Sequence, residues 1–191
     1  MSDRKNLFWA LGAVALVILV GLFVLFLNKP PESPGAATAP TGDPMQRGNE
    51  YYAQGQYASA VQQYQRALQA DAGNVSARVN LGNAYFALDK LDDAAREFTE
   101  ASRLAPNDAD IHSNLAAVLL RQGKVNEALE RVKKAVELKP DLAEGHYILG
   151  VIYRQTSQNA LALQEFQTAI TLTTDSRLKA EAEKQVAELK K

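Results

Sequence analysis

The sequence contains no cysteine and only two histidines, and its 21 Lys and Arg residues nearly balance its 22 Asp and Glu residues. The absence of cysteine excludes disulfides, thiolate nucleophiles, iron–sulfur clusters and cysteine-based zinc sites. A formal net charge of −1 gives no whole-molecule field to attract nucleic acid, which is bound through clustered Lys and Arg. The sequence therefore predicts a protein that is not an enzyme, needs no cofactor and does not bind nucleic acid.

The two histidines, His112 and His146, are separated by 34 residues. A metal site would need several converging ligands, but Asp110 and Glu144 each lie two residues before a histidine, where a helix turns them away. The chain also has no glycine-rich phosphate loop, no HExxH motif and no nucleophile elbow. We therefore expect no metal site and predict that both histidines fill packing positions between helices.

Charged and strongly polar side chains are absent from residues 7–27, which read LFWALGAVALVILVGLFVLFL. As a helix this segment would be about 32 Å long, which matches a hydrocarbon core of ~30 Å. A cleavable signal peptide is the alternative, but its apolar core normally has only ~7–15 residues. Arg4 and Lys5 before the segment outnumber Lys29 after it, which favours a cytoplasmic tail of residues 1–6. The sequence thus predicts one uncleaved transmembrane helix with the rest of the chain outside the cytoplasm.

Residues 28–42 read NKPPESPGAATAPTG and show no apolar periodicity. Such a proline-rich stretch cannot build a core and is typical of an extended linker. At ~3.1 Å per residue it would hold the following domain up to about 45 Å from the bilayer.

The rest of the chain repeats with a period of 34 residues, which predicts an array of similar structural units. Within each unit, apolar residues recur at helical spacing in two runs separated by a short turn. We predict close packing of the two helices, with a small residue of the first helix facing an alanine of the second and an aromatic ring filling the edge. The predicted packing positions are Gly48, Ala60, Ala67, Gly82, Ala94, Ala101, Ala128, Ala135, Gly150, Ala162 and Ala169.

The repeat region spans residues 43–176 and divides into four units, 41–74, 75–108, 109–142 and 143–176. Asp43 followed by Pro44 is typical of a helix N-cap and first turn, and it marks the start of the domain. Residues 177–191 have one narrow apolar stripe, which predicts an amphipathic helix that caps the open end of the array.

These units resemble tetratricopeptide repeats, and the second unit carries the most complete set of matching residues. They are Leu81, Gly82, Tyr85, Ala94, Phe98, Ala101 and Pro106. The resemblance implies an all-α fold, a right-handed superhelical solenoid of four helix hairpins. The family pattern begins with a large residue, usually Trp. The four units depart from it there and have Pro44, Arg78, His112 and His146 instead.

The resemblance further implies that the first helices line a concave groove that binds a partner peptide or helix. Asparagine amides there can pair with a peptide backbone, and aromatic rings can supply apolar pockets. The predicted groove residues are Asn49, Tyr52, Asn80, Asn83, Phe86, Asn114, Arg121, Tyr147 and Arg154. Some family members clamp a chaperone's C-terminal carboxylate, but here Asp110 stands where that clamp has a Lys, which disfavours such a ligand.

The leading hypothesis is a membrane-anchored adaptor or assembly scaffold that binds a protein partner of unknown identity. A self-associating structural repeat protein is an alternative. Single-span proteins of this layout are similar to bacterial assembly factors for cytochromes c, pili or other envelope complexes, which implies a bacterial inner membrane with the repeats on the extracytoplasmic side.

Overall fold

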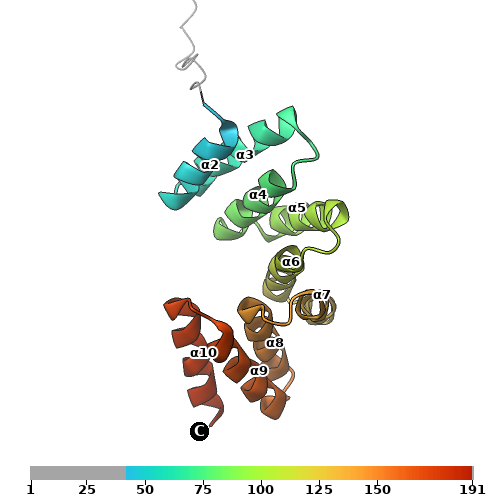
Figure 1. The fold of residues 1–191 in the computed structure, drawn as a ribbon, viewed down its shortest axis with the longest axis vertical. Coiled ribbons are helices and arrows are strands. Elements are labelled where there is room, and N and C mark those ends of the chain that lie inside the picture. Colours follow the sequence, from blue (N-terminus) through green and yellow to red (C-terminus); the bar gives the residue numbers. More distant parts are fainter. Residues whose placement is uncertain (1–41, 191) are drawn as a thin grey trace, which may run out of the picture. The chain divides into compact units, whose positions relative to one another are not determined.

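The computed structural model describes residues 42–190, and within that range it contains nine α-helices and no strand. The helices are α2 (Pro44–Ala53), α3 (Tyr57–Ala70), α4 (Val75–Ala87), α5 (Leu91–Leu104), α6 (Ala109–Arg121), α7 (Val125–Leu138), α8 (Ala143–Gln155), α9 (Asn159–Leu172) and α10 (Ser176–Leu189). Each helix packs mainly against its neighbours in the chain, and α2, α4, α6 and α8 also contact one another in succession. This part of the chain is an all-α helical repeat solenoid (Figure 1).

Side-chain caps start four of these helices. Asp43 accepts a hydrogen bond from the Met45 amide at the start of α2, and Asn74 accepts one from the Ala77 amide at the start of α4. Asp108 and Asp175 cap α6 and α10 in the same way. Because the first amides of a helix lack intrahelical partners, these polar residues fix where the helices begin, and the Asp43 cap was predicted.

The turn between the two helices of each pair passes through a left-handed backbone conformation. Gly55 and Gly123 occupy it in the first and third pairs, with φ of 72° and 75°. Asp89 and Ser157 occupy it in the second and fourth pairs, with φ of 59° and 60°. Residues with a Cβ rarely adopt this conformation, so the second and fourth turns store strain that glycine avoids.

The glycine at the repeated packing position of the first helix lies against an aromatic ring of the second helix. A Cβ placed on Gly82 would lie 2.9 Å from the Phe98 ring, and one on Gly150 would lie 2.7 Å from the Phe166 ring. These distances are shorter than ordinary carbon contacts, so only glycine fits without a shift of the ring. The prediction that the glycines face alanines, with the ring at the edge, is wrong in this respect, because the ring itself covers the glycine.

The alanine columns lie in the core at the same interfaces. All of the predicted alanine packing positions are buried, namely Ala60, Ala67, Ala94, Ala101, Ala128, Ala135, Ala162 and Ala169. Gly48 is also buried, and a Cβ on it would lie 2.4 Å from the Tyr64 ring. Small side chains at these positions let neighbouring helices approach closely.

Helix α10 ends the stack by packing against α9. It begins at Ser176 and ends at Leu189, against the predicted range of 177–191, and it buries Ala182 and Gln185. The apolar stripe predicts only apolar side chains on the buried face of this helix, so the burial of Gln185 differs from the prediction.

No helix among residues 42–190 is long and apolar enough to cross a membrane. The predicted tail 1–6, transmembrane helix 7–27 and linker 28–42 lie outside the described residues, apart from Gly42.

Candidate functional site

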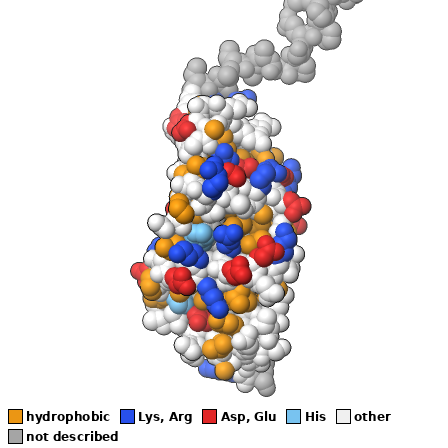
Figure 2. Space-filling view, turned by 90° about the vertical axis from the view of Figure 1, so that its right-hand side faces the viewer, with side chains coloured by type: hydrophobic (Ala, Val, Ile, Leu, Met, Phe, Trp, Pro, Cys, Tyr) orange, Lys and Arg blue, Asp and Glu red, His pale blue; other side chains and the backbone are white. Residues whose placement is uncertain are grey.

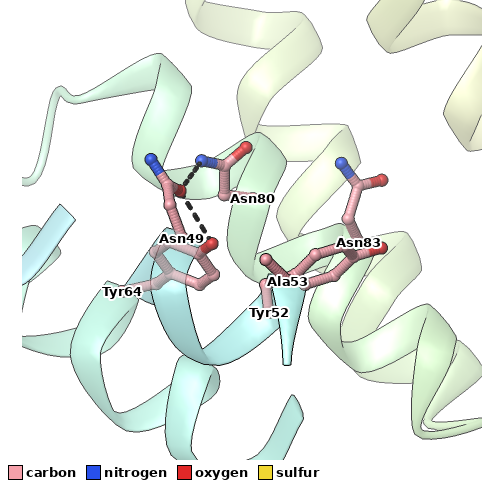
Figure 3. Close-up of a pocket in the computed structure, with 6 residues that line it drawn as sticks. All are labelled: Asn49, Tyr52, Ala53, Tyr64, Asn80 and Asn83. Carbon is pink, nitrogen blue, oxygen red and sulfur yellow. Dashed lines mark hydrogen bonds between the residues drawn. The ribbon is translucent and has the colours of Figure 1, made fainter. Parts of the chain in front are cut away.

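A pocket opens between α2, α3 and α4, and four of the predicted groove residues line it (Figure 3). These are Asn49 and Tyr52 of α2 and Asn80 and Asn83 of α4. Ala53 and Tyr64 complete the lining. Asn80 and Asn83 lie three residues apart on α4, so their side chains project from neighbouring parts of one helix face.

Two hydrogen bonds hold the amide of Asn49 in place. The hydroxyl of Tyr64 donates to Asn49 Oδ1 over 2.9 Å, and Asn80 Nδ2 donates to the same oxygen over 3.0 Å (Figure 3). Burial raises the pKa of Tyr64, with a smaller contribution from Tyr52, so the hydroxyl keeps the proton that it donates. The Asn49 amide nitrogen and the Asn80 carbonyl oxygen are left to bind another molecule.

Asn83 and Asn114 have no side-chain hydrogen bond within the described part of the chain, although both side chains are half-buried. Asn114 lies 34 residues after Asn80, and therefore at the same position of the next repeat, on α6. Each amide offers a donor and an acceptor to a ligand. Their polar atoms are not among the buried atoms without a partner, so they are open to solvent and accessible to a ligand.

Tyr52 supplies the exposed apolar surface of the pocket. It is one of only three large hydrophobic side chains that are exposed among residues 42–190, with 37% of its surface accessible. Its ring meets the Tyr57 ring edge to face, with centroids 5.1 Å apart. This contact positions the Tyr52 ring beside the amides, where an apolar side chain of a ligand can pack on it.

Phe86 and Arg121 form a second cluster, one helical turn beyond Asn83. The Arg121 guanidinium lies over the Phe86 ring, 5.1 Å from its centroid, and also binds Asp89, with Nη2 and Oδ1 2.8 Å apart. Three side chains from α4, its turn and α6 are thereby joined. The guanidinium thus has a cation–π contact with the ring and an ion pair with the carboxylate in the absence of any ligand.

Tyr147 and Arg154 lie at the opposite end of the stack, where α10 faces α8. The Tyr147 ring packs on Phe166, with centroids 5.6 Å apart, and burial raises the pKa of the Tyr147 hydroxyl. Arg154 Nη1 donates to Gln185 and lies 3.1 Å from a carboxylate oxygen of Glu188. The sequence reasoning missed these α10 contacts, because α10 was treated only as a cap.

A shallow depression adjoins Tyr147 on this side. Its lining comes from α8, α10 and the residue before α10, and consists of Glu144, Tyr147, Asp175, Arg177, Leu178, Ala180, Glu181 and Lys184. Acidic and basic groups are mixed in it, and Glu181 already accepts a hydrogen bond from Gln185. The nine predicted groove residues are therefore divided among a pocket at α2 to α4, a stacked pair at α4 and α6, the single Asn114, and a cluster at α8 and α10.

The two histidines make structural contacts. Nε2 of His112 donates to the Pro106 carbonyl and Nε2 of His146 to the Pro140 carbonyl, each over 2.9 Å. Nδ1 of His146 also lies 2.7 Å from Glu165, whereas Nδ1 of His112 is buried without a partner. Each histidine thus ties its helix to the loop before it, and no group of possible metal ligands occurs among the described residues.

The surface at the right of Figure 1, where α5 and α7 lie, mixes charges of both signs. Figure 2 shows Lys and Arg interspersed with Asp and Glu over this face. On α5, Arg96 pairs with Asp93 over 2.7 Å and Arg103 pairs with Glu100 over 3.1 Å. Short-range pairing of this kind leaves no large area of one charge on the face drawn.

Comparison with known proteins gives a consistent family assignment. A family model for the tetratricopeptide repeat matches residues 51–118 and, in an overlapping placement, residues 89–152, so that the two matches together cover more than half of the chain. A search of curated protein sequences gave no match.

Several solved structures share this fold. YrrB, described as a TPR protein with an unusual peptide-binding site, is 27% identical; the match covers 72% of this chain and 71% of YrrB, with a TM-score of 0.61. TTC0263, a thermophilic TPR protein of Thermus thermophilus, is 23% identical; the match covers 76% of this chain and 79% of TTC0263, with a TM-score of 0.66. The first TPR of Spaghetti (RPAP3), bound to the HSP90 peptide SRMEEVD, is 27% identical; the match covers 60% of this chain and 90% of Spaghetti's, with a TM-score of 0.58.

Proposed function

Because the chain belongs to the tetratricopeptide repeat family, we propose that it is a membrane-anchored adaptor that binds an extended peptide segment of a partner protein. The observation that carries the proposal is the pocket in which Asn49, Asn80 and Asn83 converge beside Tyr52. YrrB and Spaghetti support it, since their structures are described in terms of peptide binding.

The proposed binding mode combines amides and aromatic rings. An extended peptide has main-chain donors and acceptors on both edges, and the free groups of Asn49, Asn80, Asn83 and Asn114 match them. Tyr52 would take an apolar side chain of the same segment. Affinity from main-chain contacts depends little on sequence, so we expect the apolar contact to select among peptides.

The anchor belongs to the same proposal. The apolar run of residues 7–27 and the proline-rich residues 28–42 support a membrane span followed by a tether. We place the protein in a bacterial inner membrane, with the repeats on the extracytoplasmic side, where it would take part in assembling or stabilising an envelope complex. A cytochrome c, pilus or outer-membrane assembly system would each provide such a complex.

The topology can be tested without a background signal, because the chain has no cysteine. Gln167→Cys places one exposed thiol on α9. In intact cells, a maleimide that cannot cross the inner membrane should label this thiol. Labelling only after the inner membrane is lysed would show that the repeats face the cytoplasm and would refute the proposed orientation.

Partner binding is tested by crosslinking the full-length protein in its native membrane and identifying what is captured. The triple variant Asn80→Ala/Asn83→Ala/Asn114→Ala should lose the partner, because it removes three amides that lie on the first helices. The matched control is Asn107→Ala/Asn126→Ala/Asn159→Ala, which removes three exposed asparagine side chains elsewhere. Equal capture by both variants would refute binding through the asparagines, and recovery of the protein alone would favour self-association.

A further inference from the structure

The guanidinium groups of the proposed groove are both occupied by carboxylates of this chain. Arg121 Nη2 lies 2.8 Å from Asp89 Oδ1, and Arg154 Nη1 lies 3.1 Å from Glu188 Oε2. Each of these four side chains keeps between 38% and 69% of its surface exposed, so a ligand can reach them. The charge of the bound segment therefore depends on whether a ligand can compete with Asp89 and Glu188.

Arg121 is held more firmly than an ion pair alone would hold it. Its guanidinium also stacks on Phe86, which fixes the plane of the group and leaves it little freedom to turn toward a ligand. Phe86 lies three residues after Asn83 on α4, so this neutralised cation adjoins the asparagine pocket.

Asp89 lies at the turn position that has a positive φ in every repeat. Its φ is 59°, and the equivalent residues of the first and third repeats are Gly55 and Gly123. Ser157 has a φ of 60° at the equivalent position of the fourth repeat, so the conformation belongs to the turn and not to the carboxylate. At residue 89 the strained turn carries a carboxylate that reaches the next repeat.

We propose that Asp89 and Glu188 set the charge specificity of the groove, so that it binds an uncharged extended segment and disfavours acidic ones. This inference rests on the proposed function. A ligand carboxylate that pairs with Arg121 must displace Asp89, and it exchanges one exposed ion pair for another with no net gain. The displaced carboxylate then repels the ligand. The Asn49 amide nitrogen, the Asn80 carbonyl oxygen and the amides of Asn83 and Asn114 have no such competitor, and they bind an uncharged main chain.

The peptide bound to Spaghetti shows what this groove should reject. Its sequence, SRMEEVD, carries two Glu and one Asp in addition to its terminal carboxylate. We expect a fluorescein-labelled SRMEEVD peptide to bind the full-length protein, held in detergent, more weakly than SRMQQVN-amide, in which those four negative charges are neutralised.

The test compares three sets of 12-residue peptides on an array, with equal apolar content and net charges of −3, 0 and +3. The wild-type protein should bind the neutral set most strongly, and its binding should change little with added salt. Asp89→Ala/Glu188→Ala removes the carboxylates that compete for both guanidinium groups and should raise binding of the acidic set about fivefold, with a new dependence on salt. Binding of the neutral set should stay the same.

The matched control is Glu130→Ala/Glu183→Ala, which removes two exposed carboxylates that have no ion pair within residues 42–190. It changes the net charge equally, so it should leave the preference for neutral peptides unchanged. A wild-type preference for acidic peptides, or an Asp89→Ala/Glu188→Ala variant with unaltered charge preference, would overturn the charge inference alone. Absence of binding to every set would overturn the proposed function together with it.

Discussion

The third repeat differs from the other three at the interface between its two helices. In the first, second and fourth repeats a glycine lies against the ring of Tyr64, Phe98 or Phe166. At the equivalent positions the third repeat has Ala116 and Val132, which are both fully buried. One methyl group is added on the first helix and an aromatic ring is replaced by a smaller side chain on the second. The added methyl group takes only part of the space that the ring fills in the other repeats, so the side chain that fits at one position depends on the side chain at the other.

Removing an aromatic ring should have the largest effect. Phe98→Ala should lower the free energy of unfolding by about 3–5 kcal/mol, because Phe98 is almost completely buried between α4 and α5. Val132→Ala removes fewer atoms from the same slot of the third repeat and should cost less. Urea denaturation of the full-length protein in detergent measures both. Equal losses would mean that the ring carries no more of the packing energy than the smaller side chain.

Adding a methyl group to a glycine should have the next largest effect. Gly82→Ala places a Cβ 2.9 Å from the Phe98 ring and should destabilise the protein by about 1–3 kcal/mol, despite the better helix propensity of alanine. The double variant Gly82→Ala/Phe98→Val recreates the pair of the third repeat and should be more stable than the sum of the single changes predicts.

The converse exchange tests the third repeat itself. Val132→Phe should be destabilising on its own, and Ala116→Gly/Val132→Phe should recover part of the loss. Strict additivity of the single changes in either repeat would contradict the exchange of volume between the two positions.

The turns provide a smaller comparison between repeats. Ser157→Gly should stabilise the protein by about 0.5–1 kcal/mol, since glycine tolerates the φ of 60° at that position. Asp89→Gly relieves the same strain but also loses the pairing with Arg121, so its gain should be smaller. Thermal melting of both variants beside the wild type separates the two contributions, and an equal gain would show that the ion pair adds nothing to stability.

Much of the fold follows from the 34-residue period, because each repeat buries the same positions and the helices stack in chain order. The first helix cap could also be predicted, since Asp43 is a residue type with a specific role at the start of a helix. The contact between each glycine and an aromatic ring could not be predicted, because the 34-residue period shows which positions are equivalent but not which of them are in contact. That information depends on the crossing geometry of the helices.

The sequence predicted less of the candidate site than of the fold. The register gathered Asn49, Tyr52, Asn80 and Asn83 in one set, but it gave no sign that Tyr64 would orient Asn49. The presence of Tyr, where two other repeats have Phe, was the only signal. The contacts of Arg154 with Gln185 and Glu188 of α10 could not be predicted either, because side-chain pairing between helices depends on rotamers that a repeat pattern does not specify.

The hydroxyl of Tyr64 gives the smallest and most specific test of the difference between repeats. Burial raises its pKa above the ordinary value of 10.0, so the folded state holds this proton more tightly than the unfolded state does. The resulting stabilisation is complete below pH 10 and is lost as the pH rises through the pKa of the folded protein. Tyr64→Phe places the ring of the second and fourth repeats in the first, and it should lose less stability between pH 9 and pH 11 than the wild type. Urea denaturation at both pH values measures this difference. An unchanged loss would assign the alkaline sensitivity to Tyr52, Tyr85 and Tyr147, whose pKa values burial also raises.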